Sequence, residues 1–169
     1  MEFWTNPAQG EYSRLDMVDL KVHNTLFTTF YVQIVSLMKE KYGVEGAKDA
    51  LREIGEGVAT TMWKYVKPAK AQSKTLENII EEIFGVSFYY TVEFKRTETG
   101  LIIIDKNCPI CWEGVVEKDI PYCCILDGFF EKYISIANDE EYPIPKVQMR
   151  ATKSKAMGDP HCEHLLTIL

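Results

Sequence analysis

A change in the spacing of apolar residues at Val86 is the feature that most constrains the fold of this chain. Before it, apolar residues recur every three or four positions, as the inward face of a helix requires. After it, they alternate with polar or aromatic residues as far as Phe94, as in a half-buried strand. The predicted helices cover 17–42, 46–66 and 76–84, ended by Gly43, Pro68 and Gly85, and a second strand follows at 101–104.

The C-terminal third shows the same change of spacing, from one more predicted helix to one more pair of strands. Helical spacing over 120–137 predicts the helix, and alternation predicts strands at 146–152 and 162–169. The order indicates an α+β fold: N-terminal helices packed on a four-stranded antiparallel sheet, with a further helix between two β-hairpins. A chain of 169 residues is typical of one domain, which we expect over 17–169 after an N-terminal arm at 1–16.

Charge and hydropathy exclude several classes of partner. The chain carries 25 acidic and 19 basic residues, so it lacks the positive surface that binding to nucleic acid requires. No segment reaches the roughly 18 apolar residues of a membrane span, and the first residues do not have the pattern of a signal peptide. We therefore expect a cytoplasmic protein, in which cysteines are more often metal ligands or catalytic thiols than disulfides.

Five cysteines stand out, because a chain of this size can build a core without metal or disulfides. The pair in Cys108-Pro109-Ile110-Cys111 has the spacing of half a tetrahedral metal site. Sulfur ligands favour zinc, with iron as the second choice. The remaining candidates are Cys123, Cys124, Cys162, His161 and His164, and since Cys123 and Cys124 are adjacent, one of them is expected to pack as a small apolar residue.

A redox enzyme is the alternative use of Cys108 and Cys111, because a dithiol at a helix N-terminus can attack disulfides. Such a pair should follow the first strand and open a long helix, whereas Trp112-Glu113-Gly114 opens a poor one. The chain shows no nucleophile elbow, no zinc-protease helix and no dinucleotide fingerprint. Catalysis is therefore the less favoured expectation.

Two stretches of the last third resemble the 4-vinyl reductase domain family. They are residues 121–130, which include Cys123 and Gly128, and residues 155–165, where Gly158-Asp159 is followed by Cys162. Members of that family are described as predicted hydrocarbon- or small-molecule-binding domains. They are related in fold to transport-protein-particle (TRAPP) subunits and to the sensor domains of phenol-responsive transcription activators. The resemblance implies a TRAPP-like ligand-binding fold.

The resemblance also bears on the metal. In zinc-bearing sensor relatives the ion is held by a helix cysteine, an acidic residue and two cysteines that flank the glycine-aspartate loop. Cys123 and Cys162 match two of these ligands, whereas the other two positions fall on Ser154 and Ala151, which are poor zinc ligands. We therefore expect the two unassigned cysteines to replace them. The predicted zinc ligands are Cys108, Cys111, Cys123 and Cys162, with Cys124 or His161 as alternates.

A pocket for a hydrophobic small molecule is what the resemblance implies for function, in a sensory or carrier role. The aromatic residues expected to line it are Phe30, Trp63, Phe88, Tyr90 and Phe129, although residues at such spacing are most often ordinary core. Apolar residues on more than one side of the first helix favour a homodimer. A purely structural dimer subunit is the remaining alternative.

Overall fold

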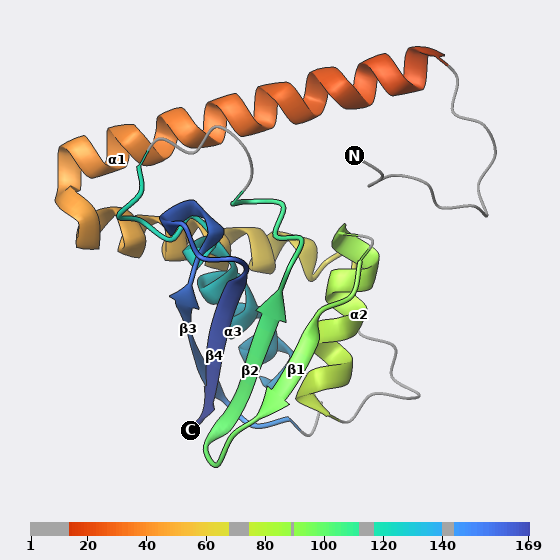
Figure 1. Cartoon of the computed structure of the whole chain (residues 1–169). Coiled ribbons are helices and arrows are strands. Elements are labelled where there is room, and N and C mark those ends of the chain that lie inside the picture. Colours follow the sequence, from red (N-terminus) through yellow and green to blue (C-terminus); the bar gives the residue numbers. More distant parts are fainter. Residues whose placement is uncertain (1–13, 68–74, 89, 112–116, 140–143) are drawn as a thin grey trace.

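The computed structural model describes residues 14–67, 75–88, 90–111, 117–139 and 144–169, which form an α+β fold. Four antiparallel strands make one sheet in the order β1-β2-β4-β3, and helices pack against it (Figure 1). The predicted fold class is therefore confirmed. The elements are α1 (Arg14–Met62), α2 (Leu76–Phe88), β1 (Glu93–Arg96), β2 (Gly100–Asp105), α3 (Cys124–Asp139), β3 (Val147–Lys153), the short η1 (Lys155–Met157) and β4 (Cys162–Ile168).

Helix α1 reverses direction at Gly43, the residue at which the sequence predicts a helix end. Its backbone there has φ 72° and ψ −178°, which lie outside the helical range and favour glycine. The second half therefore runs back beneath the first, and the start of the first half extends past the body of the molecule (Figure 1). Of the predicted arm at 1–16, only the last three residues are described, and they belong to α1.

The predicted strand from Val86 to Phe94 is wrong over most of its length. Helix α2 continues through Gly85 to Phe88, and β1 begins only at Glu93. The reason is tertiary: one face of α2, formed by Ile79, Ile80, Ile83 and Phe84, is fully buried and carries the helix beyond the glycine. Likewise α3 begins at Cys124, after a turn, and not at Ile120. In the part of the chain that the structure describes, no helix is both long and apolar enough to cross a membrane.

Two glycines let α1 and α3 cross in backbone contact. A Cβ atom on Gly55 would lie 2.0 Å from the carbonyl oxygen of Ile125, and a Cβ atom on Gly128 would lie 2.0 Å from that of Arg52. Neither distance is possible for real atoms, so both positions require glycine. The crossing fixes the second half of α1 on α3, directly after the cysteines that precede and begin that helix.

We expect Gly55→Ala to destabilise the protein by about 2 to 3 kcal/mol, because the methyl group forces the two helices apart. The matched control is Gly57→Ala in the same helix, where an added Cβ meets nothing within 4 Å. There the better helix propensity of alanine should add up to about 1 kcal/mol to the free energy of unfolding. Urea denaturation followed by circular dichroism measures both, and equal stabilities of the two variants would contradict the close crossing.

Candidate metal centre

Four cysteines from three distant parts of the chain meet at one end of the sheet. The Sγ atoms of Cys108, Cys111, Cys123 and Cys162 all lie within 4.8 Å of one another. Each of these residues is at least 97% buried, and all five cysteines of the chain are free thiols. The structure thus brings together the four residues that the sequence analysis selects as metal ligands.

The thiols of Cys108 and Cys111 lie in the loop that follows β2. Asp105 accepts a hydrogen bond from the backbone N–H of Asn107 through Oδ1 (2.9 Å), which closes a turn just before Cys108. Its other oxygen accepts a hydrogen bond from the hydroxyl of Tyr90 (2.8 Å), and the carboxyl group is fully buried. In the sheet Asp105 pairs with Cys162, the first residue of β4. The loop with Cys108 and Cys111 therefore starts beside Cys162.

The glycine-aspartate loop between β3 and β4 completes the surroundings of the cluster. Gly158 has φ 99°, in the left-handed region, and the carboxylate of Asp159 accepts a hydrogen bond from the N–H of Ser154 (2.8 Å). The Oγ atom of Ser154 lies 3.3 Å from the Sγ atom of Cys111. The N–H of Lys155 donates to the sulfur of Cys162 (3.4 Å). The loop motif thus places hydrogen-bond donors beside the thiols.

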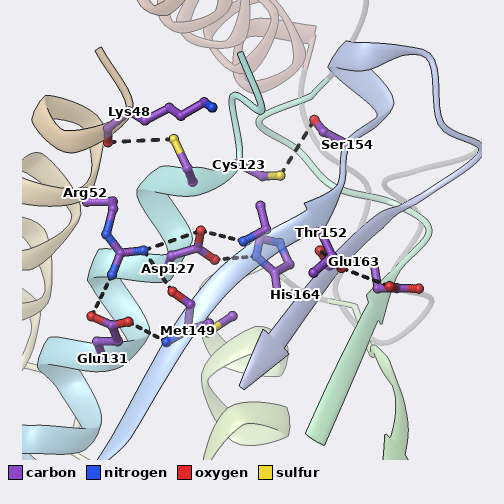
Figure 2. Close-up of polar contacts among 12 residues, drawn as sticks. Lys48, Arg52, Cys123, Asp127, Glu131, Met149, Thr152, Ser154, Glu163 and His164 are labelled. Carbon is purple, nitrogen blue, oxygen red and sulfur yellow. Dashed lines mark hydrogen bonds and ion pairs between the residues drawn. The ribbon is translucent and has the colours of Figure 1, made fainter. Parts of the chain in front are cut away.

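The adjacent cysteines Cys123 and Cys124 point to different places. Cys123 belongs to the cluster and lies 3.8 Å from the hydroxyl of Ser154 (Figure 2). The thiol of Cys124 faces α1, where it approaches the carbonyl oxygen of Lys48 at 4.0 Å, and burial raises its pKa to about 12. His161, the other alternate ligand, lies outside the sulfur cluster and its Nε2 is 3.7 Å from Glu163.

The thiols of the cluster are close enough to share protons. Hydrogen bonds from its neighbours, that of Cys108 foremost, hold the pKa of Cys111 far below the usual value for a thiol. The same contact with Cys111 raises the pKa of Cys108, and the contact with Cys108 raises the pKa of Cys123. Contacts among the thiols thus favour the thiolate form of Cys111.

The donor set fits a tetrahedral ion. Metal–sulfur bonds of about 2.3 Å in a tetrahedron put the sulfur atoms about 3.8 Å apart, so the observed cluster needs only a small contraction. Four thiolates are soft ligands that suit zinc or iron and do not suit calcium or magnesium. Four protein ligands would leave no open coordination position, which is the arrangement of structural sites.

The fold around this cluster is TRAPP-like, and the solved structures that share it include one with palmitic acid and one with phenol. A trafficking protein particle complex subunit 3 from Naegleria fowleri, covalently bound to palmitic acid, aligns with TM-score 0.67 and 15% identity, over 88% of this chain and 96% of that one. The phenol-responsive sensory domain of the transcription activator PoxR, with phenol, aligns with TM-score 0.54 and 14% identity, over 86% and 74%. No family model matches the sequence, and no curated protein does.

A buried polar network next to the cluster is the part of the site that the sequence analysis missed. Nδ1 of His164 donates to Asp127 (2.7 Å), and both residues are at least 98% buried. Burial alone would lower the pKa of His164, but the hydrogen bond to Asp127 and its charge outweigh burial and raise it. The sequence analysis names His164 only as one of the remaining candidates for a metal ligand, and nothing local marks its partner 37 positions away.

The same network covers the edge of β3 (Figure 2). The outward N–H groups of Met149 and Ala151 donate to the carboxylates of Glu131 and Asp127, and the carbonyl oxygen of Met149 accepts a hydrogen bond from Arg52. These are the backbone groups that a further strand would use. Side chains of α1 and α3 therefore close this edge of the sheet against pairing with another chain.

The five aromatic residues expected to line a pocket do not share one environment. Trp63 and Phe129 are buried and both pack on Tyr133, with ring centroids 4.8 and 5.8 Å from it. Tyr90 is half-buried and packs on Phe84 at 5.6 Å. Phe30 is 66% exposed on α1, and the side chain of Phe88 lies outside the described residues. A depression of about 600 Å³ lies at the opposite end of the sheet, between the start of α2 and the turn from β1 to β2.

Proposed function

We propose that this protein is a binding module for a hydrophobic small molecule, in a sensory or carrier role, and that a zinc ion held by its cysteines stabilises it. The observation that carries the proposal is the convergence of four buried thiols, from the end of β2, the start of α3 and the start of β4, within 4.8 Å. Buried thiols that pack only as apolar groups have no reason to gather at one point. Residues 17–169 would form a single ligand-binding domain similar to the 4-vinyl reductase domains that the sequence resembles.

Zinc in this place would have a structural task. Cys123 lies directly before α3, and Cys162 opens a central strand, so one ion would tie helix and sheet to the loop that carries Cys108. Four thiolates would fill the coordination sphere and leave no position for a substrate. The ion would therefore hold the domain together and take no part in a reaction.

The ligand half of the proposal is supported by the fold. Both solved structures named above hold an apolar or aromatic molecule, palmitic acid in one and phenol in the other. The aromatic rings around Tyr133 and Phe84 form one contiguous apolar group, and we propose that such a ligand would pack against it. We also propose a cytoplasmic homodimer, supported by the five free thiols and by the exposed Phe30 and Leu37 on α1.

A thiol-dependent redox enzyme remains the second candidate, favoured by the lowered pKa of Cys111. Against it, Cys108 and Cys111 are only 2% and 3% exposed, whereas an attacking thiolate must reach its substrate. Alkylation of the native protein separates the two functions. Slow labelling of these two residues is expected for the metal site, and fast labelling of Cys111, the thiol with the lowered pKa, for the enzyme.

We expect the purified full-length chain to contain about one zinc ion, measured by inductively coupled plasma mass spectrometry. Removing the ion with a strong chelator should lower the melting temperature, because zinc bound only by the folded state stabilises it. Native mass spectrometry before and after organic extraction should reveal an apolar molecule that co-purifies. Absence of zinc, with no uptake when it is added, would contradict the first half of the proposal. Absence of a co-purifying molecule, with no thermal shift from phenol or palmitate, would contradict the second.

A further inference from the structure

The first half of α1 lies against the residue that precedes Cys123. The hydroxyl of Tyr31 donates to the carbonyl oxygen of Tyr122 (2.7 Å), and the two rings meet edge to face with centroids 5.9 Å apart. Tyr31 is 8% exposed, and Tyr122 is fully buried. The helix therefore touches the chain one residue before a proposed metal ligand.

Eight residues further along the same helix, Lys39 makes a second attachment. Its Nζ atom pairs with the carboxylates of Glu117 and Asp119, the latter at 3.0 Å. Both carboxylates belong, like Tyr122, to residues 117–123, which we call the clamp segment. Side chains of α1 thus reach the clamp segment at two points more than two helical turns apart.

The position of the clamp segment depends on the cysteines. It ends at Cys123, and Cys111 lies a few residues before its start. Within it, Ile120 is fully buried and the N–H of Glu117 donates to the hydroxyl of Tyr122 (3.2 Å). A metal bound by Cys111 and Cys123 would hold the chain on both sides of the segment to which α1 is attached.

Tyr31 also lies close to the thiols themselves. Burial raises the pKa of Tyr31 well above its usual value, and nearby Cys124, Cys111 and Cys123 raise it further. The hydroxyl of Tyr31 is bonded to the residue before Cys123, so the buried ring of Tyr31 covers the chain beside this proposed ligand on the side of α1.

The structure contains a hinge in α1. Gly43 breaks the helix, and a Cβ atom at this position would meet nothing within 4 Å. Beyond it, the second half of α1 is held separately, by the close crossing of Gly55 with α3 and by the ion pair of Arg52 with Glu131 (2.7 Å). The two halves of α1 are thus held by separate contacts, and Gly43 is the point about which the first half would turn.

We infer that the part of α1 from Tyr31 to Tyr42, just before the break at Gly43, is a lid over the cysteine cluster, and that closure of this lid and binding of zinc favour each other. The inference rests on the proposed zinc site and adds its regulation. Such coupling is reciprocal. If bound zinc shifts the lid toward its closed position by some factor, closing the lid raises the zinc affinity by the same factor, and opening it lowers the affinity.

The first test measures release of zinc from the loaded full-length protein to an excess of a chromogenic chelator. Tyr31→Phe removes only the hydroxyl bonded to Tyr122, and Lys39→Ala removes only the ion pairs, so both variants should fold. Each is expected to release zinc roughly 5- to 10-fold faster, at the lower end of typical coupling. The matched controls are Gln33→Ala and Lys41→Ala, which alter exposed positions of the same helix and should release zinc at the wild-type rate.

The second test measures hydrogen exchange of the wild-type protein with zinc and after its removal by the chelator. Backbone amides of 31–39 are expected to exchange about tenfold faster without zinc. Those of 51–59, beyond the hinge, should change much less. If zinc binds but neither release nor exchange differs as stated, the lid is wrong and the zinc site stands. If no zinc binds, both are wrong.

Discussion

Cys123→Ser is expected to abolish stoichiometric zinc binding, whereas Cys124→Ser is expected to leave about one zinc ion in each chain. The two side chains are neighbours in sequence, but only that of Cys123 lies in the cluster. Loss of a direct ligand should lower the affinity by more than the roughly 10- to 100-fold typical of losing a group that hydrogen-bonds a ligand. Metal analysis after gel filtration, and competition with a chelator of known affinity, measure the difference.

The pair is its own control, because both changes replace a buried thiol with a hydroxyl on the same turn. Cys124→Ser removes a thiol that faces Lys48, so its effect is confined to packing between α1 and α3. Cys162→Ser should behave like Cys123→Ser, although Cys162 is far away in the sequence. Retention of zinc in Cys123→Ser, or its loss in Cys124→Ser alone, would show that the ligands are assigned incorrectly.

Asp127→Ala is expected to lower the free energy of unfolding by about 3 to 5 kcal/mol, the amount typical of breaking a buried ion pair from one side. Its carboxylate accepts hydrogen bonds from His164 (2.7 Å) and from the N–H of Ala151 (2.8 Å). Alanine would leave both donors buried without an acceptor. Urea denaturation of the variant and the wild-type protein, first loaded with zinc and then after its removal by a chelator, measures the loss of unfolding free energy.

The matched control is Asp139→Ala, at the exposed C-terminal end of the same helix. An aspartate there is unfavourable for the helix dipole, so the change should be neutral or slightly stabilising. Asp127→Asn keeps the shape and one acceptor, and should lose less stability than Asp127→Ala. Equal stabilities of Asp127→Ala and Asp139→Ala would mean that the buried network contributes nothing.

How far the sequence alone determines this protein depends on how local each signal is. Helical spacing of apolar residues locates α1, α2 and α3, and the glycine at position 43 marks the reversal of α1, because a left-handed backbone needs a residue without a side chain. An apolar run after a turn places β2, and alternation places β3 and β4 within a few residues. Alternation fails at Val86, where the buried face of α2 carries the helix onward to Phe88.

Some residues of the candidate site could likewise be identified from the sequence, and others only from the structure. Residue type and spacing indicated Cys108 and Cys111, and the resemblance to the 4-vinyl reductase domains added Cys123 and Cys162; the fold brings the four Sγ atoms within 4.8 Å of one another. Residue type and spacing alone could not choose between Cys123 and Cys124, because the direction of a side chain depends on where α3 packs. They also missed the bond between Asp127 and His164, since the two residues meet only when α3 lies on the sheet.

Local chemistry thus determined which elements form and which atoms could bind a metal. The tertiary structure decided which cysteine of the adjacent pair faces the cluster, which acid and which histidine form the buried pair, and which helix covers the thiols. The physical reason is that spacing along a chain reports the period of one helix or strand. The contacts between elements depend on their packing, here on the backbone crossing of Gly55 and Gly128 and on the pairing of β2 with β4.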